Sequence, residues 1–448
     1  MISWLLEADT RHTASSIRSA LSLRTTKSPQ EWSLLSTLAE SISQETGGIV
    51  GLAPLLKQAF RGMDLSPLAQ RWIERARTAR DSNALLDLSI ALELQRKPEI
   101  ARAIQGDALK QAQRFRVSST APDIALKLLV VKAPGDLSAN TPIECLLENT
   151  NVAIELIYVS STVPLPEIVP EHDLLFVAVA ESDENREILE ALELRLASWP
   201  RPHLNAPREI LKMERDRACA LLAPIAGIAM PQTRRIARQA LEQLATGAIP
   251  VDELLPSGQF PIITRPVDSH AGRELIKAES ATELLDYLAE NTAAEFFISQ
   301  FIDYSSADGL FRKSRVVLVR GTPFLCHMGI SEHWMVHYPY AEMIAHPERR
   351  EEEMRAMEGF DVGFAHRHRQ ALAALAEQID LEYFGLDCAE SRDGRLVIFE
   401  VASAMLVHAM DNPEIFPYKA TQMRTVFDAF RAMLFGSVPG LPKASANA

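Results

Sequence analysis

Two carboxylates near the C-terminal end of the chain are spaced so that they could bind a cation together. Asp387 and Glu400 lie in two apolar, strand-like segments that flank the dipeptide Asp393-Gly394. This dipeptide is strongly preferred in two-residue type I′ turns, so we expect a hairpin in which Arg392 pairs with Arg395. Counting back along both strands from that pair places Asp387 directly opposite Glu400, on the same face of the hairpin.

Two carboxylates that face each other across a strand pair repel, so this pairing is destabilising unless something offsets it. A divalent cation between them would remove the penalty, and hard oxygen ligands suit Mg²⁺. The alternative is that Asp387 and Glu400 lie on a solvated sheet face, with Val397, Phe399 and Val401 forming a core set on the opposite face. The pattern of the hairpin alone leaves both interpretations open.

Further candidate ligand-binding residues lie upstream of this hairpin. In chain order they are Asp216-Arg217, Thr264-Arg265-Pro266, Ser269-His270-Ala271-Gly272-Arg273, Ser299-Gln300-Phe301-Ile302 and Arg312-Lys313-Ser314-Arg315. No single segment is specific. Taken with the two acidic strands, however, their order and spacing resemble the ATP-grasp superfamily, most closely the branch that contains ribosomal-protein glutamate ligases and glutathione-synthetase-like enzymes.

The resemblance implies ATP and Mg²⁺ as cofactors. Asp387 and Glu400 stand where that family has its two magnesium-binding strands. Gln300, Phe301 and Ile302 stand where it has the hinge segment that holds adenine, which needs an apolar slot with hydrogen bonds along its edge. The metal and adenine ends of a nucleotide site are thereby assigned to separate parts of the chain.

The resemblance also implies a phosphate-binding set between those two ends. Arg217, Arg265 and Arg315 would surround the triphosphate, because phosphate oxygens are stabilised by charged donors. Ser269 and His270 belong to the loop expected to cover the phosphates. Arg265 and Arg315 are the candidate catalytic residues. Taken singly, each arginine is better explained as one partner of a surface ion pair.

The reaction that the resemblance implies is a ligation. A carboxylate attacks the γ-phosphate of ATP to give an acyl phosphate and ADP, and an amine or thiol then displaces phosphate. The substrate is expected to be a small molecule, an amino acid or a peptide. Two alternatives stay open: a nucleotide-binding helical-repeat scaffold or interaction protein without turnover, and a kinase that stops at the phosphorylated product.

The chain departs from the family pattern at three positions. Arg217 and Arg265 stand where lysine is usual, which keeps the charge but changes the geometry of the donors. Ala402 stands two residues after Glu400, where the family has a third metal ligand, an asparagine. Because alanine cannot bind a metal, one of the two expected Mg²⁺ ions would be weakly held, unless Ser403 or water substitutes.

Several histidines are secondary candidates. His333 and His337 have the spacing of a helical zinc pair, but no third ligand is evident, so they either line an acceptor pocket or pack beside Trp334. His408 follows the second acidic strand and would suit the substrate side of the site, or is an ordinary surface histidine. The segment 366–369 begins an expected helix and is expected to form a solvated face.

The fold class expected from these patterns is multidomain. Residues 1–118 read as an all-helical domain, with a degenerate helical-repeat array as an open alternative, and residues 121–203 as a small domain with a parallel α/β sheet. Residues 204–437 are expected to form an α+β ATP-grasp domain of two subdomains, with a boundary near 290–300. Residues 438–448 are expected to be a disordered tail.

Elements are expected at these positions. Helices are expected at 32–42, 67–79, 82–93, 142–148, 184–197, 216–222, 284–289 and 370–379. Strands are expected at 124–131, 152–159, 174–180, 260–265, 296–302, 315–319, 323–330, 383–390 and 395–401.

Composition narrows the classes of function. The chain has 448 residues, 47% hydrophobic and 23% charged, with a formal net charge of −13. This charge argues against binding to nucleic acid or to an anionic membrane, because both depend on neutralising negative charge. The four widely spaced cysteines predict free thiols in a reducing compartment. We therefore expect a cytoplasmic protein, with a homo-oligomer left open.

Overall fold

The computed structural model describes residues 47–119, 121, 123–267, 269, 272–336 and 341–441. The expected helix at 32–42, His270, His337 and most of the expected tail lie outside the described residues. The described chain divides into two compact units. We call residues 211–402 the central unit, and residues 47–210 together with 403–441 the terminal unit.

The terminal unit begins with the helices α3 (Leu52–Phe60), α4 (Ser66–Ala79), α5 (Ser82–Leu94) and α6 (Pro98–Gln111). The predictions of helices at 67–79 and 82–93 are confirmed by α4 and α5. The start of α5 is fixed by Asp81, whose side chain accepts a hydrogen bond from the backbone N–H of Ala84 at 3.1 Å. An aspartate at this position satisfies one of the donors that a helix leaves unpaired at its N-terminus.

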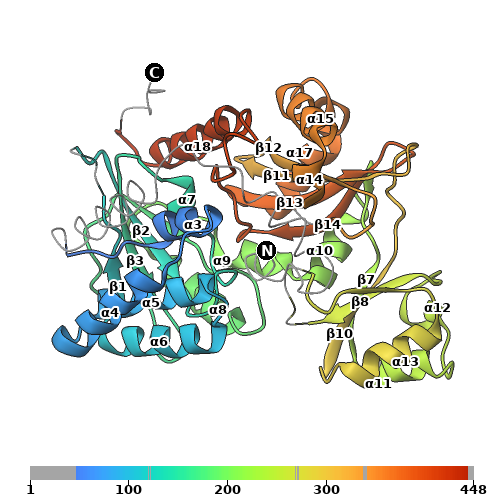
Figure 1. Ribbon diagram of the computed structural model, residues 1–448, viewed down its shortest axis with the longest axis horizontal. Helices are drawn as coiled ribbons and strands as arrows, with labels where there is room; N and C mark the ends of the chain where they lie inside the picture. Colours follow the sequence, from blue (N-terminus) through green and yellow to red (C-terminus); the bar gives the residue numbers. More distant parts are fainter. Residues whose placement is uncertain are drawn as a thin grey trace. The chain divides into compact units, whose positions relative to one another are not determined.

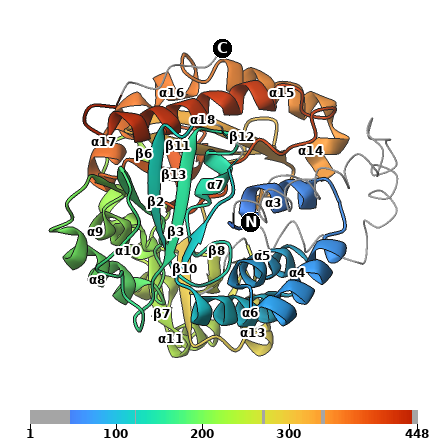
Figure 2. The same cartoon turned by 90° about the vertical axis from the view of Figure 1, so that its left-hand side faces the viewer.

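A five-stranded sheet forms the core of the terminal unit, with strands in the order β1 (Arg114–Arg116), β3 (Val152–Tyr158), β2 (Leu126–Lys132), β4 (Leu174–Val177) and β5 (His203–Leu204). All pairs except β1 with β3 are parallel, and Figure 2 shows β2 beside β3. The helices α7 (Ile143–Leu146), α8 (Arg186–Leu196) and α9 (Pro207–Ile210) complete this part. The predicted small parallel sheet is therefore present.

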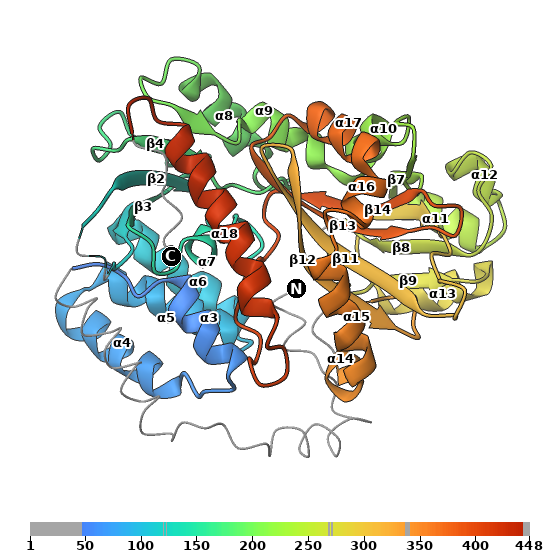
Figure 3. The same cartoon turned by 90° about the horizontal axis from the view of Figure 1, so that it is seen from above.

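The division of the chain differs from the expected domains at both ends of this sheet. The expected boundary at 118–121 falls inside the terminal unit, because β1 pairs with β3 and Ile49 bridges to Val117. The last helix, α18 (Lys419–Gly436), was expected in the ATP-grasp domain but belongs to the terminal unit. Phe430 on this long helix (Figure 3) packs edge-on against Phe176 of β4, with ring centroids 5.9 Å apart.

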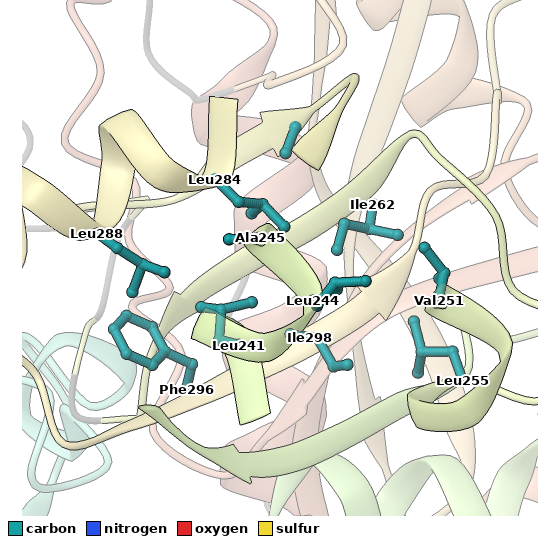
Figure 4. Close-up of a cluster of buried hydrophobic side chains, with 11 residues drawn as sticks. Leu241, Leu244, Ala245, Val251, Leu255, Ile262, Leu284, Leu288, Phe296 and Ile298 are labelled. Carbon is teal, nitrogen blue, oxygen red and sulfur yellow. The ribbon is translucent and has the colours of Figure 1, made fainter. Parts of the chain in front are cut away.

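The central unit contains a four-stranded antiparallel sheet, in the order β7 (Thr233–Ala237), β10 (Glu295–Gln300), β8 (Ile262–Pro266) and β9 (Ile276–Ala278). Helices α11 (Arg238–Ala245) and α13 (Ala281–Glu290) lie against this sheet, and α12 (Val251–Leu254) lies nearby (Figure 1). Their apolar faces meet those of the strands in one buried cluster, which includes Leu241, Leu244, Leu284, Phe296 and Ile298 (Figure 4).

The start of α13 is stabilised by two hydrogen bonds to side chains. The Ser280 side chain accepts a hydrogen bond from the N–H of Glu283, and Glu283 in turn accepts one from the N–H of Glu279 at 2.9 Å. The first bond satisfies a donor in the first turn of the helix, and the second fixes the backbone of the residue before the N-cap. The predicted helix at 284–289 is thus confirmed and begins three residues earlier.

The second sheet of the central unit has the strand order β12 (Thr322–Ser331), β11 (Phe311–Val319), β13 (Tyr383–Glu390), β14 (Leu396–Ala402) and β6 (Ile228–Ala229). All its pairs are antiparallel except β14 with β6. The remaining helices are α10 (Arg215–Leu222), α14 (Ala341–Ala345), α15 (Pro347–Glu358), α16 (Phe364–Arg367) and α17 (Arg369–Ile379), with a 3₁₀ turn at Leu211–Met213. Mainly antiparallel sheets with separate helices agree with the α+β class expected for this part of the chain.

The four cysteines agree with the free thiols expected from their spacing. All four cysteines are free and buried. Within the described ranges, none of the helices combines the length and the apolar character that crossing a bilayer requires.

Candidate active site

The turn that joins β13 to β14 differs from the predicted one. Gly394 donates to the carbonyl of Ser391, and Ser391 donates to the carbonyl of Arg395, both at 2.9 Å. The loop therefore has three residues rather than two. Gly394 has a φ of 80°, whereas Asp393 is not among the residues with positive φ, as a type I′ turn would require. The prediction of a two-residue type I′ turn is wrong.

The predicted pairing of the two carboxylates is nevertheless confirmed, because a second irregularity restores the register. Cys388 pairs with Ile398, and the next pair is Asp387 with Glu400, so Phe399 is an extra residue on β14. A β-bulge of this kind is common beside functional sites, where it redirects a side chain. The longer turn and the bulge each shift the register by one residue, in opposite directions.

The pair belongs to a longer row that crosses the sheet. His327 on β12 pairs with Arg315 on β11, Arg315 pairs with Asp387 on β13, and Asp387 pairs with Glu400 on β14. Directly paired residues of antiparallel strands project from the same face. The four polar side chains are thus presented together by the long strands seen in Figure 3.

Asp387 is buried and held by two cations. Arg315 donates from Nε to Oδ1 at 2.8 Å and from a second nitrogen to Oδ2 at 3.0 Å, and the Lys313 ammonium lies 2.8 Å from Oδ2. Burial alone would raise the pKa of Asp387, but the charges of Arg315 and Lys313 outweigh it and hold the pKa far below its usual range. Asp387 is therefore a permanent anion in a cationic setting.

Glu400 has its own cation, which comes from α10. Arg215 lies 2.7 Å from Glu400 Oε1, and the Arg215 side chain is 24% exposed. Burial and the negative charge of Asp387 act to raise the pKa of Glu400. The positive charges of Arg215, Arg265 and Lys313 outweigh them, so that pKa is lowered. Both carboxylates are thus charged, and both are already compensated by side chains of the chain itself.

On α10, Arg215 contacts the carboxylate pair, and Arg217, the arginine named from the sequence, does not. Arg217 is 54% exposed and pairs at 2.9 Å with Glu214, one turn away along the chain, whereas Arg215 contacts the carboxylate pair. No sequence signal distinguished the two arginines, since they stand two residues apart around the same helix start. Lys313 was also missed, although its spacing of two residues from Arg315 places both side chains on one face of the strand.

Arg265 is buried at the end of β8. It donates from Nε to Ser269 Oγ at 2.9 Å and also to the Ser269 carbonyl. Burial, with the nearby charge of Arg215, lowers the pKa of Arg265 to about 9, against the opposing effect of Glu400, so it stays a cation at neutral pH. Arg265 and Ser269 thus lie together, and the charge of Arg265 interacts with that of Glu400.

The hinge segment has a different internal arrangement from the one expected. The side-chain amide of Gln300 accepts from the N–H of Gln259 and donates to its carbonyl, both at 3.0 Å, and also donates to the carbonyl of Pro261. These three bonds link the Gln300 side chain to the backbone just before β8. Phe301 and Ile302 are half-buried.

A lysine and a tryptophan lie beside the ring of Phe301 in the hinge segment. Lys277 of β9 lies 4.5 Å from the centre of the Phe301 ring, and Trp334 meets the same ring edge-on at 6.0 Å. A flat apolar surface with a cation on it is the kind of environment that stacking with a purine base would use.

The histidine interpretations need correction where the structure describes them. Residues 332–335 form bends rather than a helix, so His333 is not part of a helical zinc pair. His368 was expected on a solvated face but is buried, with Nε2 2.9 Å from Glu390. His408 belongs to the terminal unit, where its ring packs 4.4 Å from that of Phe60.

The donor set fits one particular kind of metal site. Ala402 pairs with Gly385, and neither has a side chain that can bind a metal. Within the described ranges, no group of three or more His, Cys, Asp or Glu side chains is placed to hold a metal. Two opposed carboxylates, completed by water and phosphate oxygens, fit the way Mg²⁺ is bound with nucleotides.

No protein-family model and no curated protein matches the chain. Among solved structures, three that are similar are an ATP-grasp RimK domain protein from Sphaerobacter thermophilus (TM-score 0.38, 15% identity, covering 70% of this chain and 100% of that one), the VanG D-Ala:D-Ser ligase from Enterococcus faecalis (0.40, 15%, 68% and 99%) and a D-alanine-D-alanine ligase from Coxiella burnetii (0.39, 12%, 68% and 96%). At identities of 12–15% and TM-scores of 0.38–0.40, these similarities do not assign the chain to a family.

Proposed function

We propose that the central unit is an ATP-dependent ligase that joins a carboxylate to an amine or thiol through an acyl phosphate. The observation that carries this proposal is the opposed pair of Asp387 and Glu400, held in place by cations. Arg215, Arg265, Lys313 and Arg315 supply four positive charges against two negative ones, a net charge of +2. Such a group is complementary to an anion that brings its own metal.

Each side chain has a part in this proposal. Asp387 and Glu400 would hold Mg²⁺, which screens the charge of the triphosphate when bound. Arg265 and Arg315 would donate to the phosphate oxygens, and Arg215 takes the part that the sequence assigned to Arg217. Positioning and charge neutralisation account for most of the catalysis expected at such a site.

The purine would lie against the segment 300–302. Because the Gln300 side chain is already bonded to backbone atoms, the edge of the base would be read by main-chain groups, with the ring of Phe301 as the apolar surface. Ser269, and His270 outside the described residues, would cover the phosphates.

The reaction balances without any further reagent. A carboxylate oxygen attacks the γ-phosphorus and the bond to the β–γ bridging oxygen breaks, which releases ADP. A nucleophile then attacks the acyl carbon and inorganic phosphate leaves. Hydroxylamine serves as a general nucleophile for this second step, so the natural acceptor does not have to be known.

The test is a screen of small carboxylic acids, amino acids and peptides with Mg²⁺, ATP and hydroxylamine. We expect ADP and a hydroxamate in equal amounts for at least one acid, and none for the Glu400→Gln variant. ADP without a hydroxamate would favour the kinase alternative. Acids that mass spectrometry finds bound to the purified protein are included in the screen. If ATP binds but no ADP forms with any of these acids, the non-catalytic scaffold is favoured.

A further inference from the structure

The bulge in β14 determines which face of the sheet Glu400 occupies. From the turn to the bulge, the paired residues of β13 and β14 follow one register, and beyond it they follow another, which brings Glu400 opposite Asp387. If β14 kept the first register, Asp387 would face Phe399 instead. Glu400 would then lie on the opposite face, because a shift of one residue reverses the direction of every side chain. With this turn, the carboxylate pair therefore requires the bulge.

The sheet itself gives little support to the strand beyond the bulge. β6 pairs with β14 at Leu396 and Val397, which both precede Phe399. In the described part of the sheet, residues 400–402 pair with β13 alone. Because one ladder rather than two holds this part of β14, a contact from outside the ladder can decide its register.

The Phe399 side chain makes such a contact. Its ring lies 4.7 Å from that of Tyr304, centre to centre. Tyr304 is 4% exposed, its ring also meets that of Phe311 at 4.9 Å, and its hydroxyl donates to the carbonyl of Trp334. Aromatic pairs in such arrangements stabilise a structure beyond the area that they bury. Tyr304 is thus fixed by other partners and gives Phe399 a firm surface to pack against.

The turn of the hairpin contacts the residue that follows Tyr304. Arg392 donates from Nε to the carbonyl of Ser305 at 2.8 Å, and a second nitrogen of its guanidinium donates to Ser305 Oγ. The longer turn and the bulge are the two irregularities that together set the register of the carboxylates. Both therefore contact the same two residues, which follow the hinge segment 300–302.

We propose that Phe399 is a positioning residue for the metal pair: by packing against Tyr304 it holds the bulge, and the bulge keeps Glu400 opposite Asp387. This inference rests on the proposed function, which gives the two carboxylates their metal. The Phe399 side chain acts on metal binding through the register of the backbone.

The test measures metal binding and nucleotide binding separately. The full-length protein is saturated with a non-hydrolysable ATP analogue, and Mn²⁺ in place of Mg²⁺ is titrated and followed by electron paramagnetic resonance. Phe399→Ala should weaken Mn²⁺ binding by about 10-fold, the effect of losing one aromatic pair that favours the bulged register. Binding of the analogue in excess chelator should stay unchanged, because the hinge segment and the arginines remain.

Deletion of Phe399 separates the register from the packing. Without this residue, Ile398 and Glu400 become neighbours in a regular ladder, and their pairs with Cys388 and Asp387 are both kept. Mn²⁺ should then bind as it does to the unaltered protein, although the aromatic contact is lost. If the deletion weakens Mn²⁺ binding as much as Phe399→Ala does, Phe399 acts through packing alone and the inference is wrong.

Val397→Ala is the matched control. Val397 lies on the same strand and in the same buried cluster as Tyr304, but it belongs to the regular part of the ladder, opposite Ala389. This variant should bind Mn²⁺ like the unaltered protein. A loss in Phe399→Ala no greater than in Val397→Ala would overturn the inference, even where circular dichroism shows that the deletion variant does not fold. If the unaltered protein binds neither Mn²⁺ nor the analogue, the proposed function fails and this role of Phe399 fails with it.

Discussion

The two units each contain a deeply buried aspartate, and the two are stabilised in opposite ways. In the terminal unit, Asp87 accepts hydrogen bonds from the backbone N–H groups of Val50 and Gly51, each at 2.9 Å. In the central unit, Asp387 is held by the side-chain cations of Lys313 and Arg315. Both carboxyl groups are nearly inaccessible to solvent.

The groups that bond to each aspartate, backbone N–H groups at Asp87 and side-chain cations at Asp387, determine the pKa of its carboxyl group. Burial raises the pKa of Asp87 to about 7, because the two backbone N–H groups only partly offset it and the charge of Arg75 contributes less still. The cations around Asp387 reverse the effect of burial and lower its pKa. Backbone donors cannot leave, whereas side-chain cations can turn toward another anion. We infer that Asp87 stabilises the fold and that Asp387 is part of an exchangeable ion cluster.

The substitution expected to have the largest effect on this difference between the two aspartates is Asp387→Asn. An amide cannot provide the charge that a metal ion needs, so we expect Mn²⁺ binding in the presence of the ATP analogue to fall by a factor of at least about 100. Arg315 loses its buried partner, a change that costs roughly 3–5 kcal/mol in stability, so folding must be checked by circular dichroism.

The Asp387→Asn result is measured by titration calorimetry at fixed nucleotide concentration. Nucleotide binding in excess chelator should persist, because Arg265 and the hinge segment remain. Unchanged Mn²⁺ affinity in a folded variant would place the metal elsewhere.

The second test is the pH dependence of the region around Asp87. An unfolded aspartate ionises near pH 4, whereas Asp87 in the folded chain ionises near pH 7. Between these values the folded state binds more protons, so stability falls as the pH rises from about 4 to about 7, by up to about 4 kcal/mol. Asp87→Asn should abolish this fall.

Hydrogen exchange of the amides in 49–56, corrected for the intrinsic pH dependence of exchange, measures the effect of Asp87 locally. Nucleotide binding should be the same in the variant and the unaltered protein. A pH slope that survives Asp87→Asn would mean that another group titrates there.

The smallest expected effect compares the two arginines of α10. Arg215→Ala removes a charge-assisted contact of Glu400 and should weaken binding of the Mg²⁺–nucleotide complex by about 10-fold. Arg217→Ala removes an exposed pair with Glu214 and should change it by no more than about 2-fold. Calorimetric titration of both variants under the same conditions checks this difference. Equal losses would mean that the helix, rather than the contact with Glu400, governs affinity.

The sequence allowed the elements and the ladder partners to be predicted better than the side-chain contacts. Strand alternation and the Asp-Gly turn pointed to the pairing of Asp387 with Glu400, although two local irregularities that no propensity rule predicts had to cancel for it to hold. The sequence could not show that Arg215 rather than Arg217 contacts Glu400, because the rotation of a helix start depends on a backbone angle that neighbouring residues do not determine. The sequence also assigned the Gln300 side chain to adenine. It could not show that this side chain bonds to the backbone of residues 259–261, because those bonds depend on tertiary structure.

The division of the chain into the terminal and central units could not be predicted from sequence patterns either. Helices at 67–79 and 82–93 were predictable from apolar spacing, but their inclusion with the sheet depends on β1 and on the bonds from Val50 and Gly51 to Asp87. Contacts between residues this far apart in sequence leave no periodic signal. For the same reason, the membership of α18 in the terminal unit could not be foreseen.

The central claim is that the cations on Asp387 and Glu400 exchange for a metal ion and a triphosphate. A crystal structure of the protein with Mg²⁺ and the non-hydrolysable ATP analogue tests it most directly. The account predicts Mg²⁺ bound by both carboxylates and Arg315 turned from Asp387 toward the phosphates. A nucleotide bound while the pairs of Arg315 with Asp387 and of Arg215 with Glu400 stay intact, with the metal elsewhere, would contradict it.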